Sequence, residues 1–158
     1  MKKQYSYVKL MPRLLALALD TFIIGILSNP FTQYIYNYLL YFNNLRLPDI
    51  TNQNLAQLQA FLLSPKYITV LVEFVLIYIA ILFIYFVGSW IKFDTTLGKL
   101  VMRIKIIDST TFSKPSKSQY IKRFFGYSLG IFSLLIIPFD KHYRGVHDKI
   151  AGTTIIKI

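Results

Sequence analysis

The residues from Tyr67 to Ile91 form an apolar run that is too long and too uniform for an ordinary water-soluble fold. The run has 25 residues and a single charge, Glu73. About 20 consecutive apolar residues are enough for a helix to cross the hydrocarbon core of a bilayer. Because a spanning segment must satisfy its own backbone hydrogen bonds there, the run predicts a membrane-spanning helix over 67–91.

A second apolar run lies near the N-terminus, from Pro12 to Asn29. Its 18 residues, about 27 Å as a helix, are just long enough to cross. Proline suits the first turn of a helix, and Asn29-Pro30 is expected to end or bend it. Four basic residues lie at or before its start, which predicts a cytoplasmic N-terminus: Lys2, Lys3, Lys9 and Arg13.

The region 30–66 is expected to lie at the outer face of the membrane. Residues 31–42 carry four tyrosines, and their apolar side chains share one helical stripe, as in a short interfacial helix. Residues 43–66 contain only three charges, which marks an exterior loop: Arg46, Asp49 and Lys66.

The region 92–119 is expected to be cytoplasmic. Residues 92–123 contain eight basic side chains, as the positive-inside rule requires. Within them, residues 100–107 alternate with a period of two, which predicts a strand. Residues 153–158 form a second β-like run, and an isolated strand cannot satisfy its backbone, so the two strands should pair.

The third apolar segment, 120–139, leaves two topologies open. Its apolar part, Phe124 to Phe139, has 16 residues and is short for a crossing. If it crosses, the C-terminal strand ends outside the cell together with several basic residues. If it re-enters or lies at the interface, the two strands meet in the cytoplasm, which length and charge favour.

Composition supports a membrane protein and excludes other classes. The chain is 54% hydrophobic and 16% charged, whereas a soluble domain carries about 25% charged residues. The net charge is +11, and the basic residues lie beside the apolar runs. This placement indicates contact with an anionic inner leaflet rather than with nucleic acid. The absence of cysteine excludes disulfides and thiolate chemistry.

Two ionisable residues in the first run are candidate functional groups. Arg13 and Asp20 are seven residues apart, about 10 Å along one helix face. Ionisable side chains within a membrane segment are costly and usually face a protein interior or a wet cavity. The alternative is that Arg13 anchors the helix and Asp20 makes a structural hydrogen bond. Glu73 lies about 15 Å further out, so it is expected to face an outer vestibule or to hydrogen-bond a tyrosine.

Several motifs together resemble the RDD family of bacterial membrane proteins. These are Arg13 with Asp20, then Thr95-Thr96-Leu97-Gly98-Lys99 before a strand, and finally the run from Arg144 to Thr153, which contains His147-Asp148 and Ala151-Gly152-Thr153. The resemblance covers most of the chain and identifies Arg13, Asp20 and Asp148 as the family's arginine and two aspartates. It implies a family whose function is largely undefined, with transport suggested and cation/proton antiport proposed for some members.

The sequence therefore predicts one membrane domain over 1–158. It is mainly α, with two spanning helices, a third spanning or re-entrant segment, interfacial helices and a cytoplasmic two-stranded element. The domain is expected in the inner membrane of a bacterium, with both termini cytoplasmic and a second copy or a membrane protein as partner. Its parts are helix 12–29, outer region 30–66, helix 67–91, strand region 92–119, third segment 120–139 and the C-terminal motif and strand 140–158.

Two functions remain open at this stage. In the first, Asp20 exchanges a proton or a monovalent cation, Arg13 tunes it and Asp148 is its inner partner, or the cluster passes a small ligand. In the second, the three residues form a structural clamp in an accessory or scaffold subunit. The secondary candidates are Glu73, Lys99, Arg144 and His147.

A cluster of histidines and aspartates near the C-terminus raises the question of an enzyme. It consists of Asp140, His142, His147 and Asp148, and such residues can hold a metal. Their spacing matches no helix-face metal motif, and the run follows a membrane segment among basic residues. We therefore expect no enzyme activity, no metal and no cofactor.

Overall fold

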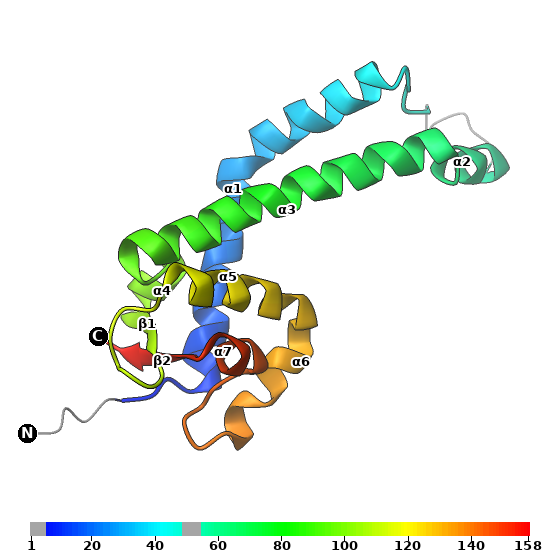
Figure 1. Ribbon diagram of the computed structural model, residues 1–158. Helices are drawn as coiled ribbons and strands as arrows, with labels where there is room; N and C mark the ends of the chain where they lie inside the picture. The colour runs from blue at the N-terminus through cyan, green and yellow to red at the C-terminus, as the bar shows by residue number, and fades with distance from the viewer. Residues whose placement is uncertain (1–5, 49–54) are drawn as a thin grey trace, which may run out of the picture. The chain divides into compact units, whose positions relative to one another are not determined.

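The computed structural model describes residues 6–48 and 55–158 (Figure 1). Its elements follow the order α1 (Leu10–Phe42), α2 (Leu55–Leu62), α3 (Pro65–Phe93), α4 (Leu97–Val101), β1 (Ile104–Asp108), α5 (Lys117–Gly126), η1 (Tyr127–Leu129), α6 (Gly130–Leu135), η2 (Ile137–Phe139), α7 (Val146–Ala151) and β2 (Thr153–Lys157). The predicted class, a mainly α membrane protein with a small two-stranded element, is confirmed.

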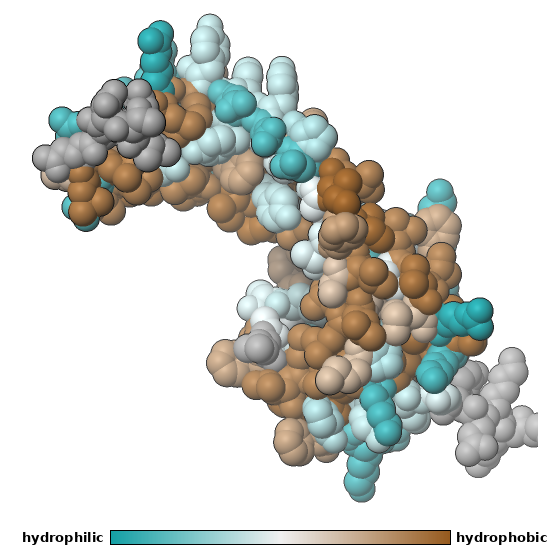
Figure 2. Space-filling view, turned by 180° about the vertical axis from the view of Figure 1, so that it is seen from behind, coloured by the Kyte–Doolittle hydropathy of each residue, from teal (hydrophilic) through white to brown (hydrophobic). Residues whose placement is uncertain are grey.

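The helices α1 and α3 are each long and apolar enough to cross a membrane. Of the most apolar 18-residue window in each, only 22% in α1 and 11% in α3 is buried inside the protein. Apolar side chains accordingly cover much of the face seen in Figure 2. Large exposed apolar surfaces are rare in soluble monomers and mark contact with a membrane or another protein.

The helix α3 contains the predicted span 67–91 and adds two residues at each end. Of the two expectations for Asn29-Pro30, an end or a bend, the end of the first helix at Asn29 is wrong, because α1 continues through Pro30 to Phe42. Residues 31–42 therefore do not form a separate helix. Pro30 removes one backbone donor and crowds the carbonyl of Ile26, but the rest of the hydrogen-bond ladder remains, and membrane helices tolerate such a loss.

Two compact units are visible in the pattern of contacts along the chain, Gly25–Leu82 and a unit that joins the described residues up to Ile24 with Phe83–Ile158. We call them the hairpin unit and the core unit. In the hairpin unit, Leu39, Leu40 and Val70 form a small apolar core. The core unit contains the sheet, the short helices from α4 to α7 and every site residue discussed below except Glu73.

The sheet of the core unit confirms the predicted pairing of the two strands. β1 and β2 are antiparallel, with Ile106 opposite Ile155 (Figure 1). The N-terminal segment follows the other edge of β2, where Val8 N–H donates to the Ile155 carbonyl over 3.2 Å. The strand begins later than predicted, because Leu100 and Val101 lie in α4 and their alternating pattern overlaps a short helical turn.

The core unit has one apolar centre, around Trp90. This side chain is fully buried at the end of α3. Residues from the N-terminal segment, both strands and α5 surround it, so the C-terminal end of α3 is fixed against the rest of the unit. The buried members are Val8, Ala16, Val87, Trp90, Ile104, Ile106, Tyr120 and Ile155.

The third apolar segment does not form one straight helix. Its two parts, Lys117–Leu129 and Phe132–Phe139, are bent by 104° relative to each other, as in a broken span or a re-entrant loop. The first part packs closely on α7, because Gly126 has no side chain. A Cβ at this position would lie 2.8 Å from the Cα of His147.

Candidate functional site

Asp20 projects from α1 to the start of α4 and is fully buried. Its Oδ2 accepts a hydrogen bond from the Thr96 hydroxyl over 2.5 Å. Its Oδ1 accepts from the Gly98 N–H over 2.7 Å and from the Tyr85 hydroxyl over 2.8 Å. Burial of a carboxylate without hydrogen bonds would be very costly in free energy. The three donors replace the water molecules that Asp20 loses when it is buried.

The approach of α4 to Asp20 requires glycine at position 98. A Cβ there would lie 2.9 Å from the Asp20 Cγ and closer still to the backbone oxygen of Ala16. Thr96, as the N-cap residue of α4, supplies the hydroxyl donor beside it. The Thr-Thr-Leu-Gly-Lys motif therefore builds a receptor for the carboxylate of α1.

Asp148, in α7, lies between two arginines. Its Oδ2 is 2.5 Å from Arg13 Nη1 and accepts from the Gly145 N–H over 3.0 Å. Its Oδ1 accepts from Arg123 Nη1. The same Arg123 nitrogen donates to the Thr153 hydroxyl over 2.7 Å, and both arginines and Asp148 are buried.

The charges around Asp148 keep it ionised. Burial alone would raise the pKa of this carboxyl, but the charges of Arg123 and Arg13 and the hydrogen bond from the Gly145 N–H hold the pKa well below its usual range. The group is therefore a permanent anion at physiological pH.

The predicted trio separates into two sites. Arg13 pairs with Asp148, whereas the three donors to Asp20 are uncharged. One carboxylate thus lies between two guanidinium groups, in place of one guanidinium between two carboxylates. Arg123 was missed, because it was counted among the basic residues that set topology. A signal was available, since Tyr120, Arg123 and Tyr127 share one helical face.

His147, next to Asp148, is a buried neutral imidazole. Its Nδ1 contacts the Ser133 hydroxyl, which also accepts from the His147 backbone N–H over 3.0 Å. Its Nε2 lies 3.5 Å from Asp148 Oδ1, and its ring stacks on Tyr127 at 4.4 Å between centroids. Burial lowers the pKa of His147 to about 3, although the Asp148 charge acts in the opposite direction.

Lys99 is buried, with 6% of its surface exposed, and its Nζ lies 5.2 Å from the centre of the Trp90 ring. No ion pair joins it to another described residue. Burial lowers the pKa of Lys99, partly against the neighbouring charges of Asp20 and Asp148, while Arg123 adds to the lowering. Lys99 is therefore the one member of the predicted set, within the described chain, that is buried, basic and without a carboxylate in salt-bridge contact.

Comparison with known proteins assigns the chain to a family. The model of the RDD family matches residues 7–152, which contain both carboxylate sites. The chain belongs to the RDD family. Uncharacterized protein RP437 of Rickettsia prowazekii (strain Madrid E) is 30% identical over 173 aligned residues, which cover 99% of each chain. No solved structure matches the chain.

The two remaining candidates of this RDD protein lie outside the paired carboxylate sites. Arg144 is partly exposed, and its Nε lies 3.3 Å from Asp140, which also pairs with Lys149 at 2.9 Å. Glu73, in the hairpin unit, accepts a long hydrogen bond of 3.4 Å from Asn43. Its hydrogen-bond partner in the described chain is thus an asparagine and not a tyrosine.

Metal ligands do not gather in the described part of the RDD chain. No group of three or more histidine, aspartate or glutamate side chains there could hold a metal ion.

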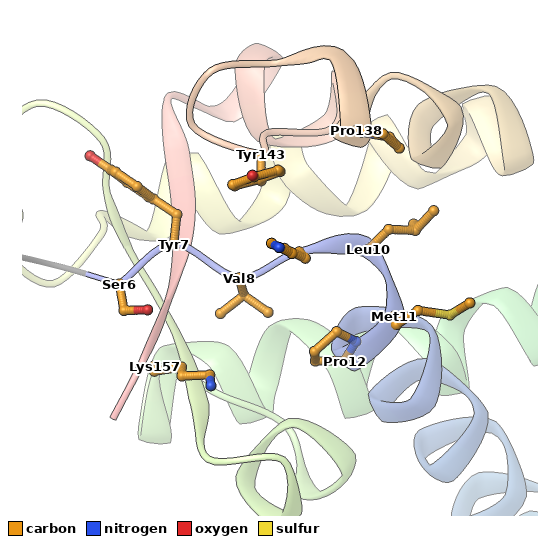
Figure 3. A pocket seen from close by; sticks show the side chains of 10 residues that line it. Ser6, Tyr7, Val8, Leu10, Met11, Pro12, Pro138, Tyr143 and Lys157 are labelled. Atoms are coloured by element: carbon orange, nitrogen blue, oxygen red, sulfur yellow. The ribbon is translucent and has the colours of Figure 1, made fainter.

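A cleft lies at the surface of the core unit (Figure 3). Its volume is about 510 Å³, and it lies along the N-terminal segment and the first turn of α1. Leu10, Met11 and Pro138 provide apolar walls, while Lys9 and Lys157 add positive charge. This combination suits an amphiphile with an anionic head.

Proposed function

We propose that this RDD protein is an accessory or scaffold subunit of a membrane complex, in which Arg13, Arg123 and Asp148 form a structural clamp and Asp20 separately fixes α1 to α4. The proposal rests on the burial and the hydrogen bonding of the two carboxylates. Asp20 and Asp148 are both fully buried, and each is held by at least three donors.

An exchanging acid would need free oxygen lone pairs and a route to water. Asp148 cannot take up a proton readily, because two guanidinium groups stabilise its charge. A cation at Asp20 would have to displace the Thr96, Gly98 and Tyr85 donors. Both arrangements favour a fixed position over ion exchange.

The clamp connects elements that are far apart in the chain. Arg13 belongs to α1, Arg123 to α5, Asp148 to α7, and Thr153 to β2. Since removal of one partner would leave a buried charge unpaired, the clamp holds the bent third segment against the first helix. A scaffold needs this kind of defined geometry.

The pairing of the strands supports a topology with both termini on the cytoplasmic side. β1 pairs with β2, and Tyr7 bridges to Ile156, so the three segments share one side of the membrane. The third segment would then enter and return on that side. The basic side chains favour the cytoplasm of a bacterial cell, where Lys9 and Lys157 of the cleft would meet anionic headgroups.

A stripe of amides on α1 supports the presence of a membrane partner. Asn29, Gln33 and Asn37 recur at intervals of four residues and are exposed. Their side chains have no hydrogen-bond partner within the described residues. Amides on a membrane helix commonly hydrogen-bond to a neighbouring helix, and they can pair with the same stripe of a second copy.

Site-directed crosslinking tests the accessory role. The chain has no cysteine, so Gln33→Cys introduces a single thiol into α1. We expect crosslinks in native membranes to a stoichiometric membrane partner or a second copy from Gln33→Cys, but not from Phe22→Cys, a control that is also exposed on the same helix. Equal yields at both positions, or only monomer, would contradict the proposal.

The second candidate function is exchange of protons with a monovalent cation, or transport of a small ligand. The observation that favours it is Lys99, a buried basic group without a carboxylate in contact. Flux measurements in proteoliposomes separate the two functions. Wild-type flux that Asp20→Asn abolishes would support exchange, and no wild-type flux would support the clamp.

A further inference from the structure

A small, partly open cavity lies beside the clamp in the core unit. Its volume is about 20 Å³, enough for one water-sized particle. Four polar side chains line it, Arg13, Lys99, Tyr127 and His147, and the rest of the wall is apolar. Neither Asp20 nor Asp148 belongs to the lining, so the polar part of the wall is dominated by donors.

The charges around this cavity are unequal. Three buried cations, Arg13, Lys99 and Arg123, stand against the two buried carboxylates Asp20 and Asp148. With all five ionised, the formal charge is +1 (three minus two). Asp148 pairs with both arginines, so that group keeps the excess of +1. Lys99 has no carboxylate in salt-bridge contact within the described chain, and its Nζ lies 5.2 Å from the centre of the Trp90 ring.

Hydrogen-bond donors without partners also indicate a negatively charged ligand. Arg13 Nη2 is buried without a hydrogen-bond partner in the described part of the chain, as are Arg123 Nε and Nη2, although Arg123 is not among the residues that line the cavity. Buried polar groups nearly always have partners, so these donors call for an acceptor. A water molecule could accept two of these bonds but would bring two hydrogens of its own into a wall with few acceptors.

We propose that this cavity binds one monatomic anion of chloride size, held by Arg13 and Lys99 with the Tyr127 hydroxyl at its side. A halide only accepts hydrogen bonds, it fits a space for one small particle, and it neutralises the excess charge. The site is independent of the proposed clamp function, because the anion would complete the cluster whether or not the protein transports anything.

Anion binding should be linked to the protonation of Lys99. The ionisable groups around Lys99 are Arg13 and Asp20 from α1, Arg123 from α5, Tyr127 from η1, and His147 and Asp148 from α7. An anion stabilises the ammonium form that burial disfavours. Affinity should therefore be highest when Lys99 is protonated and should fall as pH rises through its lowered pKa.

Fluorescence of Trp90 provides the test, because it is the one tryptophan of the chain and is fully buried next to Lys99. We expect bromide to quench the protein in detergent with a saturable dependence at pH 7, chloride to reverse this, and pH 10 to weaken it. Lys99→Met should reduce the affinity at least tenfold. Lys99→Arg should restore part of it, and Lys92→Met, at an exposed lysine, should leave it unchanged.

Unsaturable quenching, or quenching that chloride does not reverse, in the wild-type protein would overturn the anion site, and this result does not depend on any variant folding. Equal affinity in a folded Lys99→Met protein would overturn it as well. As a second measurement, chloride at constant ionic strength should raise the Tm of the wild-type protein relative to gluconate. The Tm of Lys99→Met should not respond.

Discussion

Arg13 and Asp148 are 135 positions apart in the chain, yet Arg13 Nη1 lies 2.5 Å from Asp148 Oδ2 in a site where both side chains are almost fully buried. Arg123 occupies the other carboxylate oxygen. The ion pair therefore joins the first helix to the C-terminal motif of this RDD protein through a shared carboxylate. The predictions below test whether this arrangement is structural.

Arg123→Gln should strongly destabilise the protein. The substitution leaves Asp148 with one guanidinium partner, and breaking a buried ion pair costs about 3–5 kcal/mol. Arg144→Gln is the matched control, because Arg144 pairs with Asp140 near the surface, where such pairs contribute about 0–1 kcal/mol. Unfolding by SDS in mixed micelles measures both, and similar losses would argue against the clamp.

Gly98→Ala should destabilise the contact between α1 and α4. The new Cβ would meet Asp20 at 2.9 Å and would also collide with the Ala16 carbonyl. The loss should reach about 1–3 kcal/mol, the usual cost of overpacking. Gly88→Ala is the control, since nothing lies within 4 Å of its Cβ position, and it should be neutral or slightly stabilising in the same unfolding measurement.

Thr96→Val should weaken the receptor for the Asp20 carboxylate. The valine keeps the shape but removes the hydroxyl that donates over 2.5 Å, which should cost about 1–3 kcal/mol. Thr69→Val, at an exposed threonine of α3 that bonds only its own helix, should change stability little. The prediction fails if the two variants unfold together.

Stability should fall between pH 7.5 and pH 5 because of His147. In the folded state burial holds its pKa at about 3, whereas in the unfolded chain it stays near 6.5, so the unfolded state binds the extra proton as pH falls. At pH 5 this difference amounts to about 2 kcal/mol. His147→Gln should flatten the profile, while His142→Gln, at an exposed histidine, should leave it intact.

Single cysteines should report one side for both ends of the chain. Ser6→Cys and Lys157→Cys are exposed and hydrogen-bonded neighbours at the edge of β2, so an impermeant maleimide should label both only in inverted vesicles. Lys66→Cys, at the start of α3, should label only in right-side-out vesicles. Labelling of Ser6→Cys and Lys157→Cys from opposite sides would contradict the topology.

Local sequence was sufficient for the membrane helices and the paired strands. The span of α3 follows from the hydropathy of one apolar run. The β-like runs before Asp108 and after Gly152 each needed a partner for their backbone hydrogen bonds, and they pair with each other. The family followed from the motifs that contain Arg13, Asp20 and Asp148, and the family model matches residues 7–152. The errors at Pro30 and Leu100 arose where a local helix signal and a local breaking or alternating signal compete.

Tertiary structure alone decided which charges meet. The sequence determined that Arg13, Asp20 and Asp148 are costly to bury and must find partners, but it could not assign Asp20 to Thr96, Gly98 and Tyr85 or bring Arg123 to Asp148. The physical reason is the difference between a property that depends on neighbours along the chain and one that depends on contacts in space. Transfer of a helix into lipid adds up residue by residue along the chain, whereas a hydrogen bond or ion pair acts over about 3 Å and depends on contacts between segments that are distant in sequence.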